Sequence, residues 1–170
     1  MNYIIDRASR EDAENIIEYL NIISTESDNL IMTEEQAKDI TKKDEELIID
    51  SYKYSKTDIM LVAKLESEII AVGSLKGHDR RSRASHRVTL GVTVKKKYWN
   101  KGIGREMIDS LLSYAAENEY IEIVDLTVKS DNHGAISLYE RFGFEKIGYY
   151  KDYFKNEDGY ADAVLMNLYL

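Results

Sequence analysis

The segment from residue 86 to residue 115 joins a strand, a glycine-containing turn and a helix, and it restricts the fold more than any other part of the chain. From Val88 to Val94, apolar residues at every second position alternate with polar or small ones, as in a half-buried strand. From Ile103 to Ala115, apolar residues recur every four positions, as in an amphipathic helix. These patterns predict a sheet covered by helices. Gly91, inside the strand, predicts a bulge or a close backbone approach nearby.

The flanking sequence predicts further helices. Ser9 and Asp12 have the spacing of a capping box before an amphipathic run. The charged segment 33–51 is expected to form an exposed helical stretch. Asn132 is a good N-cap for another helix, which should end before Gly143. In the first of these helices, the residues expected to be buried are Ile16, Ile17, Leu20 and Ile23.

The order of elements is that of a mixed sheet. Helices alternate with strands in the centre of the chain, which indicates one parallel pair beside antiparallel hairpins. We therefore expect an α/β (α+β) fold with about six to seven strands and about four helices. The 170 residues contain no proline and no linker-like tract, so a single domain over residues 1–170 is expected. The other expected strands are 3–5, 58–64, 69–75, 121–128, 144–150 and 161–170.

Composition excludes several classes of protein. The chain has no cysteine, which excludes disulfides, thiolate metal sites and a cysteine nucleophile. Its formal charge of −8 argues against a surface that binds nucleic acid. No apolar run approaches the roughly 18 residues of a membrane span, and the N-terminus lacks the apolar core of a signal peptide. We therefore expect a cytoplasmic protein that does not bind membranes.

The turn at residues 98–105, with the sequence YWNKGIGR, is suited to an anion. Its glycines let backbone N–H groups approach the ligand, and the N-terminus of the following helix adds partial positive charge. A tight turn without a ligand is the alternative. The turn does not match a Walker loop. A dinucleotide fingerprint starting at Gly102 also fails, because Met107 stands where the third glycine is required.

Basic residues gather around this turn. Nine basic residues and one acidic residue give the window 77–105 a net charge of +8, whereas the remaining 14 basic and 30 acidic residues give −16. A solvated surface explains part of the excess, but a basic island beside a glycine turn is better suited to a polyanionic ligand. The nine residues are Arg80, Arg81, Arg83, Arg87, Lys95, Lys96, Lys97, Lys101 and Arg105.

Two motifs resemble the GNAT N-acetyltransferase superfamily. RVTLGVTV (87–94) followed by KKKYWNKGIGREM (95–107) is similar to the strand, loop and helix that hold acetyl-CoA in that family. NHGAISLYERFGF (132–144) is similar to the family's N-x-x-A-x-x-L-Y-x-x-x-G-F signature. The motifs occur in the family's order and spacing, with a strand between them.

The resemblance implies a sheet whose two central parallel strands splay apart to admit the pantetheine arm of acetyl-CoA. Asn132 would lie near the cofactor, or it would only cap its helix. Trp99 departs from the family, which often has Gln or Arg there, so we expect altered contacts and not lost binding. Backbone groups of Val92, Thr93 and Val94 would contact the arm and polarise the thioester carbonyl. The pyrophosphate would be held by backbone N–H groups of Asn100, Lys101, Gly102, Ile103, Gly104 and Arg105.

Tyr139 matches the position of the family's usual general acid. Its phenol, with a reference pKa of roughly 10, can donate a proton to the departing CoA thiolate. The alternative is a core position shared with Ala135, Leu138 and Phe142. The implied reaction is direct attack of an unprotonated amine on the thioester, with backbone N–H groups stabilising the oxyanion and without an acyl-enzyme. The absence of cysteine is compatible with this reaction.

The general base stays open at this point. Family members often have a glutamate on the strand before the asparagine motif, where this chain has Thr127. Asp125 lies on the same strand face and could act through water, and His86 has a suitable reference pKa. Neither is chosen. The three histidines do not form a metal-ligand pattern, so no metal is expected.

Three functions compete. The leading one is an acetyl-CoA-dependent N-acetyltransferase acting on a primary amine of a small molecule or peptide. The second is a non-catalytic CoA-binding regulatory domain, and the third is a nucleotide-binding α/β protein. The tyrosines from Tyr139 onward could line an acceptor pocket or a homodimer interface, although strand packing explains most of them.

Overall fold

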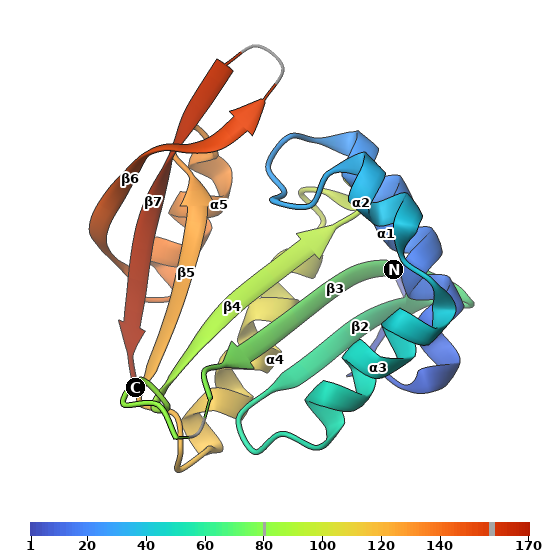
Figure 1. The fold of residues 1–170 in the computed structure, drawn as a ribbon, viewed down its shortest axis with the longest axis horizontal. Coiled ribbons are helices and arrows are strands. Elements are labelled where there is room, and N and C mark those ends of the chain that lie inside the picture. The colour runs from blue at the N-terminus through green and yellow to red at the C-terminus, as the bar shows by residue number, and fades with distance from the viewer. Residues whose placement is uncertain (80, 157–158) are drawn as a thin grey trace.

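A seven-stranded sheet forms the centre of the computed structural model, which describes residues 1–79, 81–156 and 159–170. The strand order is β1-β2-β3-β4-β5-β7-β6 (Figure 1). β4 and β5 are parallel, and the other neighbouring strands are antiparallel. The mixed sheet with one parallel pair is therefore confirmed. The strands are β1 (Ile4–Arg7), β2 (Ile59–Leu65), β3 (Glu68–Gly77), β4 (Arg87–Val94), β5 (Ile123–Lys129), β6 (Glu145–Asn156) and β7 (Gly159–Tyr169).

Five α-helices occur in the described part of the chain, one more than expected. The charged segment 33–51 contains two capping boxes, one starting at Thr33 and one at Thr41, so it forms two helices. Arg10–Asp12 and Lys96–Tyr98 form short 3-10 turns. A helix with the length and apolar character needed to span a bilayer does not occur among the described residues. The helices are α1 (Ala13–Glu26), α2 (Glu34–Asp39), α3 (Lys42–Lys53), α4 (Ile103–Glu117) and α5 (His133–Arg141).

The helices cover both faces of the sheet. Figure 1 shows α1, α2 and α3 on one face, with α4 and α5 on the other. On the α4 face, Met107 and Leu111 are fully buried in one core with Val88 of β4, as the two sequence periodicities predict. On the α1 face, Ile16 is buried in a second core.

Two expectations for these elements are wrong in detail. In α1, Tyr19 is completely buried, whereas Ile17 and Leu20 are only partly buried. In β4, Gly91 marks neither a bulge nor a close backbone approach, because β3 and β4 pair without a register shift and a Cβ on Gly91 would meet only the Ser74 Oγ, at 3.8 Å. The irregularity lies on the other edge of β4, where the parallel pairing with β5 ends.

Candidate functional site

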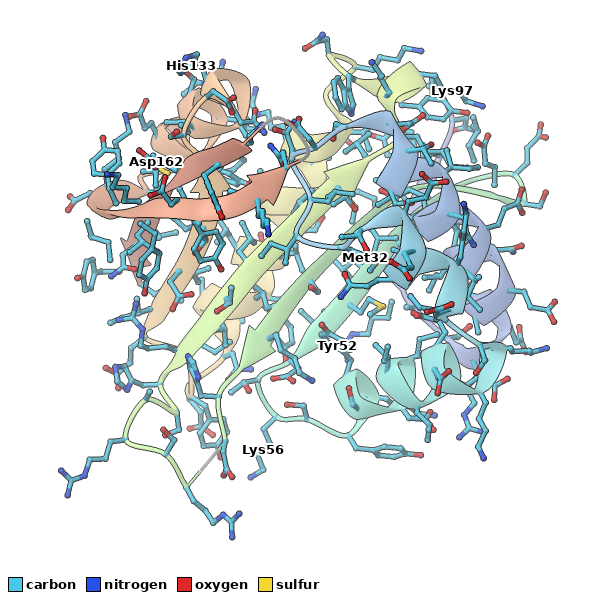
Figure 2. The ribbon with its side chains drawn as sticks, turned by 45° about the horizontal axis from the view of Figure 1, so that its top comes forward. Met32, Tyr52, Lys56, Lys97, His133 and Asp162 are labelled. Atoms are coloured by element: carbon cyan, nitrogen blue, oxygen red, sulfur yellow. The ribbon has the colours of Figure 1, made fainter. Side chains whose placement is uncertain are left out.

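The two parallel strands pair over three residues and then separate. The pairing begins with Arg87 opposite Ile123 and ends with Thr89 opposite Asp125. β4 continues for five more residues, to Val94, and the two ribbons diverge toward their carboxyl ends (Figure 1). Figure 2 agrees with this divergence, since His133 after β5 and Lys97 after β4 lie well apart, at the upper left and upper right of the view. Carboxyl ends of neighbouring strands are where open α/β sheets bind ligands.

Backbone groups of β4 face the gap between the strands. The N–H of Lys95 donates to the carbonyl of Ile70 on β3 at 3.0 Å. Because successive residues of a strand direct their amide groups to opposite sides, those of Val92 and Val94 point away from β3 and toward the gap. This end of β4 can therefore pair with an extended amide-containing ligand as with another strand.

A cavity of about 1250 Å³ occupies this region. It exceeds the roughly 300–1,000 Å³ typical of small-molecule sites, so it can hold a large ligand. Of the residues predicted from the sequence to bind the cofactor or to act in catalysis, all except Lys101 line this cavity. The predicted residues that line it are Val92, Thr93, Val94, Asn100, Gly102, Ile103, Gly104, Arg105, Asn132 and Tyr139.

The turn after β4 holds an open helix N-terminus beside the cavity. Gly102 is the N-cap of α4 and has φ of +87°, a left-handed conformation that glycine adopts without strain. No side chain forms a cap hydrogen bond there, so first-turn N–H groups remain to bind a ligand. Trp99 fixes the turn to the strand, because its indole Nε1–H donates to the carbonyl of Val94 at 2.7 Å.

The basic island divides into paired and available charges. Lys95 and Lys97 contact Glu68 at 2.8 and 3.2 Å. Burial opposes ionisation of Glu68, but hydrogen bonds from Lys95, Tyr98 and Lys97 lower its pKa to about 2. Arg81 pairs with Asp79, and Arg87 pairs with Asp125. Arg80 lies outside the described residues. Among the described residues, the exposed cations of the island left at or beside the cavity are Lys96, Lys101 and Arg105, joined by Arg141 from α5.

Tyr139 belongs to both the core and the cavity. Its side chain is 9% exposed, and its ring makes an edge contact with Phe144 at 5.7 Å between centroids. Burial raises the pKa of its phenol to about 12. The hydroxyl therefore keeps its proton at neutral pH, which a general acid requires. The core position is therefore confirmed, and the role of Tyr139 as general acid stays a prediction.

Asn132 occupies its expected capping position. Its side-chain oxygen accepts a hydrogen bond from the N–H of Ala135 at 3.2 Å, at the start of α5. Asn132 also lines the cavity. The cap is confirmed, and a contact with a cofactor stays a prediction.

The two residues considered as a general base do not line the cavity. Asp125 accepts a hydrogen bond from the hydroxyl of Thr89 at 2.7 Å and contacts Arg87 at 3.2 Å. His86 immediately precedes β4, at the opposite end of the strand from the gap. Thr127, two residues after Asp125, does line the cavity.

Part of the cavity wall comes from the end of α1, which the sequence did not indicate, and part from β6, where Tyr153 is one of the tyrosines suggested to line an acceptor pocket. Glu26 and residues 27 and 29–31, at and after the end of α1, line it, as do Tyr153 and Phe154 of β6. Tyr19 of α1 supports the wall from behind, since its hydroxyl donates to Thr93 at 2.9 Å. In the described parts of the chain, no three histidine, aspartate or glutamate side chains are arranged to hold a metal ion.

Comparisons with known proteins agree with this geometry. Residues 27–144 match the family model described as acetyltransferase (GNAT) family. L-amino acid N-acetyltransferase AaaT of Escherichia coli K12 is 29% identical over 99 residues, 55% of this chain and 61% of that protein. [Ribosomal protein bS18]-alanine N-acetyltransferase of the same organism is 31% identical over 79 residues, 46% and 53% of the two chains. The matches thus span about half to three-fifths of these relatives.

Solved structures show the same fold. An acetyltransferase of the GNAT family from Streptococcus pneumoniae has a TM-score of 0.94 and 25% identity, covering 99% of this chain and 100% of that one. A phosphinothricin acetyltransferase from Sinorhizobium meliloti, in complex with acetyl-CoA, has a TM-score of 0.85 and 17% identity, with coverage of 100% and 89%.

Proposed function

Because the chain belongs to the GNAT family of acetyltransferases, we propose that it transfers the acetyl group of acetyl-CoA directly to a primary amine of a small molecule or peptide. The observation that carries the proposal is the gap between β4 and β5, with the amide groups of Val92 and Val94 facing it. We also propose that residues 1–170 act as one domain, since all seven strands join one sheet. A homodimer and a cytoplasmic location stay predictions.

The residues around the gap suit the pantetheine arm and the pyrophosphate of acetyl-CoA. Backbone groups of Val92 and Val94 would hold the pantetheine arm by strand-like hydrogen bonds, whereas those of Thr93 point toward β3. The open N-terminus of α4, at residues 100–105, would hold the pyrophosphate, with Lys101 and Arg105 supplying positive charge. Asn132 would contact the arm from the β5 side. These roles are supported by the cavity that joins the strands and the turn.

In the proposed reaction, an unprotonated amine attacks the thioester carbon, and a C–N bond forms as the C–S bond breaks. Backbone N–H groups of β4 stabilise the charge that develops on the thioester oxygen. Tyr139 gives its proton to the departing thiolate, and its raised pKa keeps that proton in place until then. The proton lost by the amine leaves to solvent and Tyr139 regains one from solvent, so the products are an amide and CoA with the enzyme unchanged.

Acceptor classes follow from the relatives. One relative is named for acetylation of L-amino acids, and the other for acetylation of an alanine of a ribosomal protein. We therefore propose an amino group of an amino acid or of a peptide N-terminus as the first class to test.

A screen of amines that measures release of free CoA tests the proposal. The panel should contain L-amino acids, peptides that begin with alanine, and polyamines, and the protein mass should be recorded after each reaction. We expect CoA release matched by acetylated amine, with no acetyl group on the protein. Tight CoA binding without turnover of any amine would favour a non-catalytic CoA-binding domain, and acetylated protein would overturn direct transfer.

A further inference from the structure

The end of α1 reaches both of the splayed strands. Glu26, the last residue of α1, accepts a hydrogen bond from the backbone N–H of Lys96, just beyond β4, at 2.7 Å. Asp28, two residues later, forms an ion pair with Lys129, the last residue of β5. Two carboxylates of one short segment therefore bridge the gap at the carboxyl ends of the parallel strands.

The ion pair between Asp28 and Lys129 forms the β5 side of this bridge. Lys129 is 5% exposed, and a buried ammonium group requires a partner. The hydrogen bond between the two side chains raises the pKa of Lys129 and lowers that of Asp28. Asn156 of β6 also donates to Asp28, at 3.3 Å. Asp131 lies 3.5 Å from the Lys129 ammonium and is its second acidic partner.

The segment held by this pair forms one wall of the cavity. Residues 27 and 29–31 line the main cavity together with Ser74, Thr89 and Thr127 of the sheet. A second hollow of about 470 Å³ adjoins it, lined by Asp28, Met32 and the end of β6. Ser27, Leu30, Ile31, Tyr153 and Phe154 line both spaces.

The two walls of the cavity differ in what they offer. One wall, formed by the turn at residues 98–105 and the edge of β4, supplies backbone groups and cations, which suit acetyl-CoA, the proposed acetyl donor. Residues 27 and 29–31 supply serine, asparagine and aliphatic side chains, and this wall also borders the second hollow. An acceptor amine that approaches from this side meets the segment that Asp28 and Lys129 hold.

We propose that Asp28 and Lys129 are a positioning pair, which holds residues 27–31 as the acceptor-side wall and keeps open an entrance through the adjoining hollow. The inference rests on the proposed function. The pair contacts neither the reacting amine nor the thioester, so it acts through the wall. Its loss should therefore change the KM for the acceptor more than the affinity for acetyl-CoA.

Lys129→Met is the test variant, because it removes the charge and leaves Asp28, whose side chain is 61% exposed, free to be solvated. Lys129→Arg keeps the charge and serves as the conservative rescue. Lys42→Met is the matched control. It breaks an ion pair between Lys42 of α3 and Glu14, which lies near the start of α1, at the other end of that helix from Asp28.

Three readouts separate the outcomes. They are the KM for an acceptor, the dissociation constant of acetyl-CoA by calorimetry, and hydrogen exchange of the amides of residues 27–33. The acceptor probes are L-leucine, L-phenylalanine and a tripeptide that begins with alanine. For Lys129→Met we expect an acceptor KM raised about tenfold, since small misplacements of a binding wall have effects of this size or larger. Acetyl-CoA affinity should stay within about twofold, exchange should accelerate, and Lys129→Arg should restore most of the change.

Unchanged exchange of residues 27–33 in Lys129→Met would overturn the inference, and so would an equal loss of donor and acceptor affinity. Failure of the proposed function has a different signature, because then the wild-type protein itself would not bind acetyl-CoA or would not acetylate any probe. The exchange measurement requires no acceptor, so it decides whether the pair holds the wall in either case.

Discussion

Thr89 and Asp125 are the last residues at which the two parallel strands pair, and the Thr89 hydroxyl donates to the Asp125 carboxylate at 2.7 Å. Beyond this hydrogen bond the strands separate. Arg87, at the start of β4, forms an ion pair with the same carboxylate and also donates a hydrogen bond to Asn167 of β7 at 3.0 Å. Asp125 therefore closes the base of the gap and connects three strands.

Replacing Asp125 by Asn should weaken the fold and leave the acid–base chemistry intact. Arg87 would lose its charged partner, so we expect the free energy of unfolding to fall by about 1–3 kcal/mol. Denaturant unfolding measures this change. The pH dependence of kcat/KM should match that of the wild type. Disappearance of its acid limb would instead identify Asp125 as the general base.

Tyr139→Phe should slow transfer without weakening donor binding. The variant keeps the ring that packs on Phe144 and removes the proton, so we expect kcat to fall about 10²-fold. The acetyl-CoA dissociation constant should hardly change. Because the pKa of Tyr139 is about 12, wild-type kcat should not decline between pH 7 and 10 through ionisation of this phenol. Tyr149→Phe, at an exposed position of β6 outside the cavity lining, is the control, and equal kcat values for Tyr139→Phe and wild type would rule out the acid role.

Glu45 should make the fold less stable as the pH rises. It is 2% exposed, and burial raises its pKa from 4.5 to about 7. The folded state therefore keeps a proton that the unfolded state releases between these values, so stability falls by up to about 1.4 kcal/mol per pH unit. The loss begins near pH 4.5 and levels off above pH 7.

Glu45→Gln removes this titration. Unfolding by denaturant at pH 5 and pH 8 should show a stability gain over wild type that is larger at pH 8. Glu35→Gln, at an exposed position of α2, should show no such difference. A pH-independent effect of Glu45→Gln would contradict the assignment.

Gly102→Ala should reduce acetyl-CoA affinity through backbone conformation. A Cβ at this position meets no atom within 4 Å, but the left-handed φ of +87° disfavours alanine by roughly 1 kcal/mol. The turn would relax and shift the N–H groups, so we expect about tenfold weaker binding by calorimetry. Gly148→Ala, in β6 and outside the cavity lining, should bind like wild type.

Much of the fold was predictable because local patterns agree with the tertiary structure. The alternation from Val88 to Val94 and the four-residue spacing from Ile103 to Ala115 both match observed elements. Gly143, expected to end a helix, has φ of +91° after α5. The division of the segment 33–51 had a signal as well, since Thr41 is followed three residues later by Asp44.

The missed parts of the site depend on contacts between distant segments. Tyr19 and Thr93 are 74 residues apart, and Asp28 and Lys129 are 101 residues apart. No local period or capping pattern relates such pairs. Charge counting alone is also insufficient. It finds the basic island, but it cannot reveal that Lys95 and Lys97 both form ion pairs with Glu68.

Calorimetric titration of the wild-type protein with acetyl-CoA, ATP and NAD tests the central claim, that the gap between β4 and β5 is an acetyl-CoA site. The account predicts one acetyl-CoA bound per chain, at least about tenfold more tightly than either nucleotide, because only acetyl-CoA can occupy both the anion-binding turn and the β4 backbone. Absence of acetyl-CoA binding, or tighter binding of ATP or NAD, would contradict it.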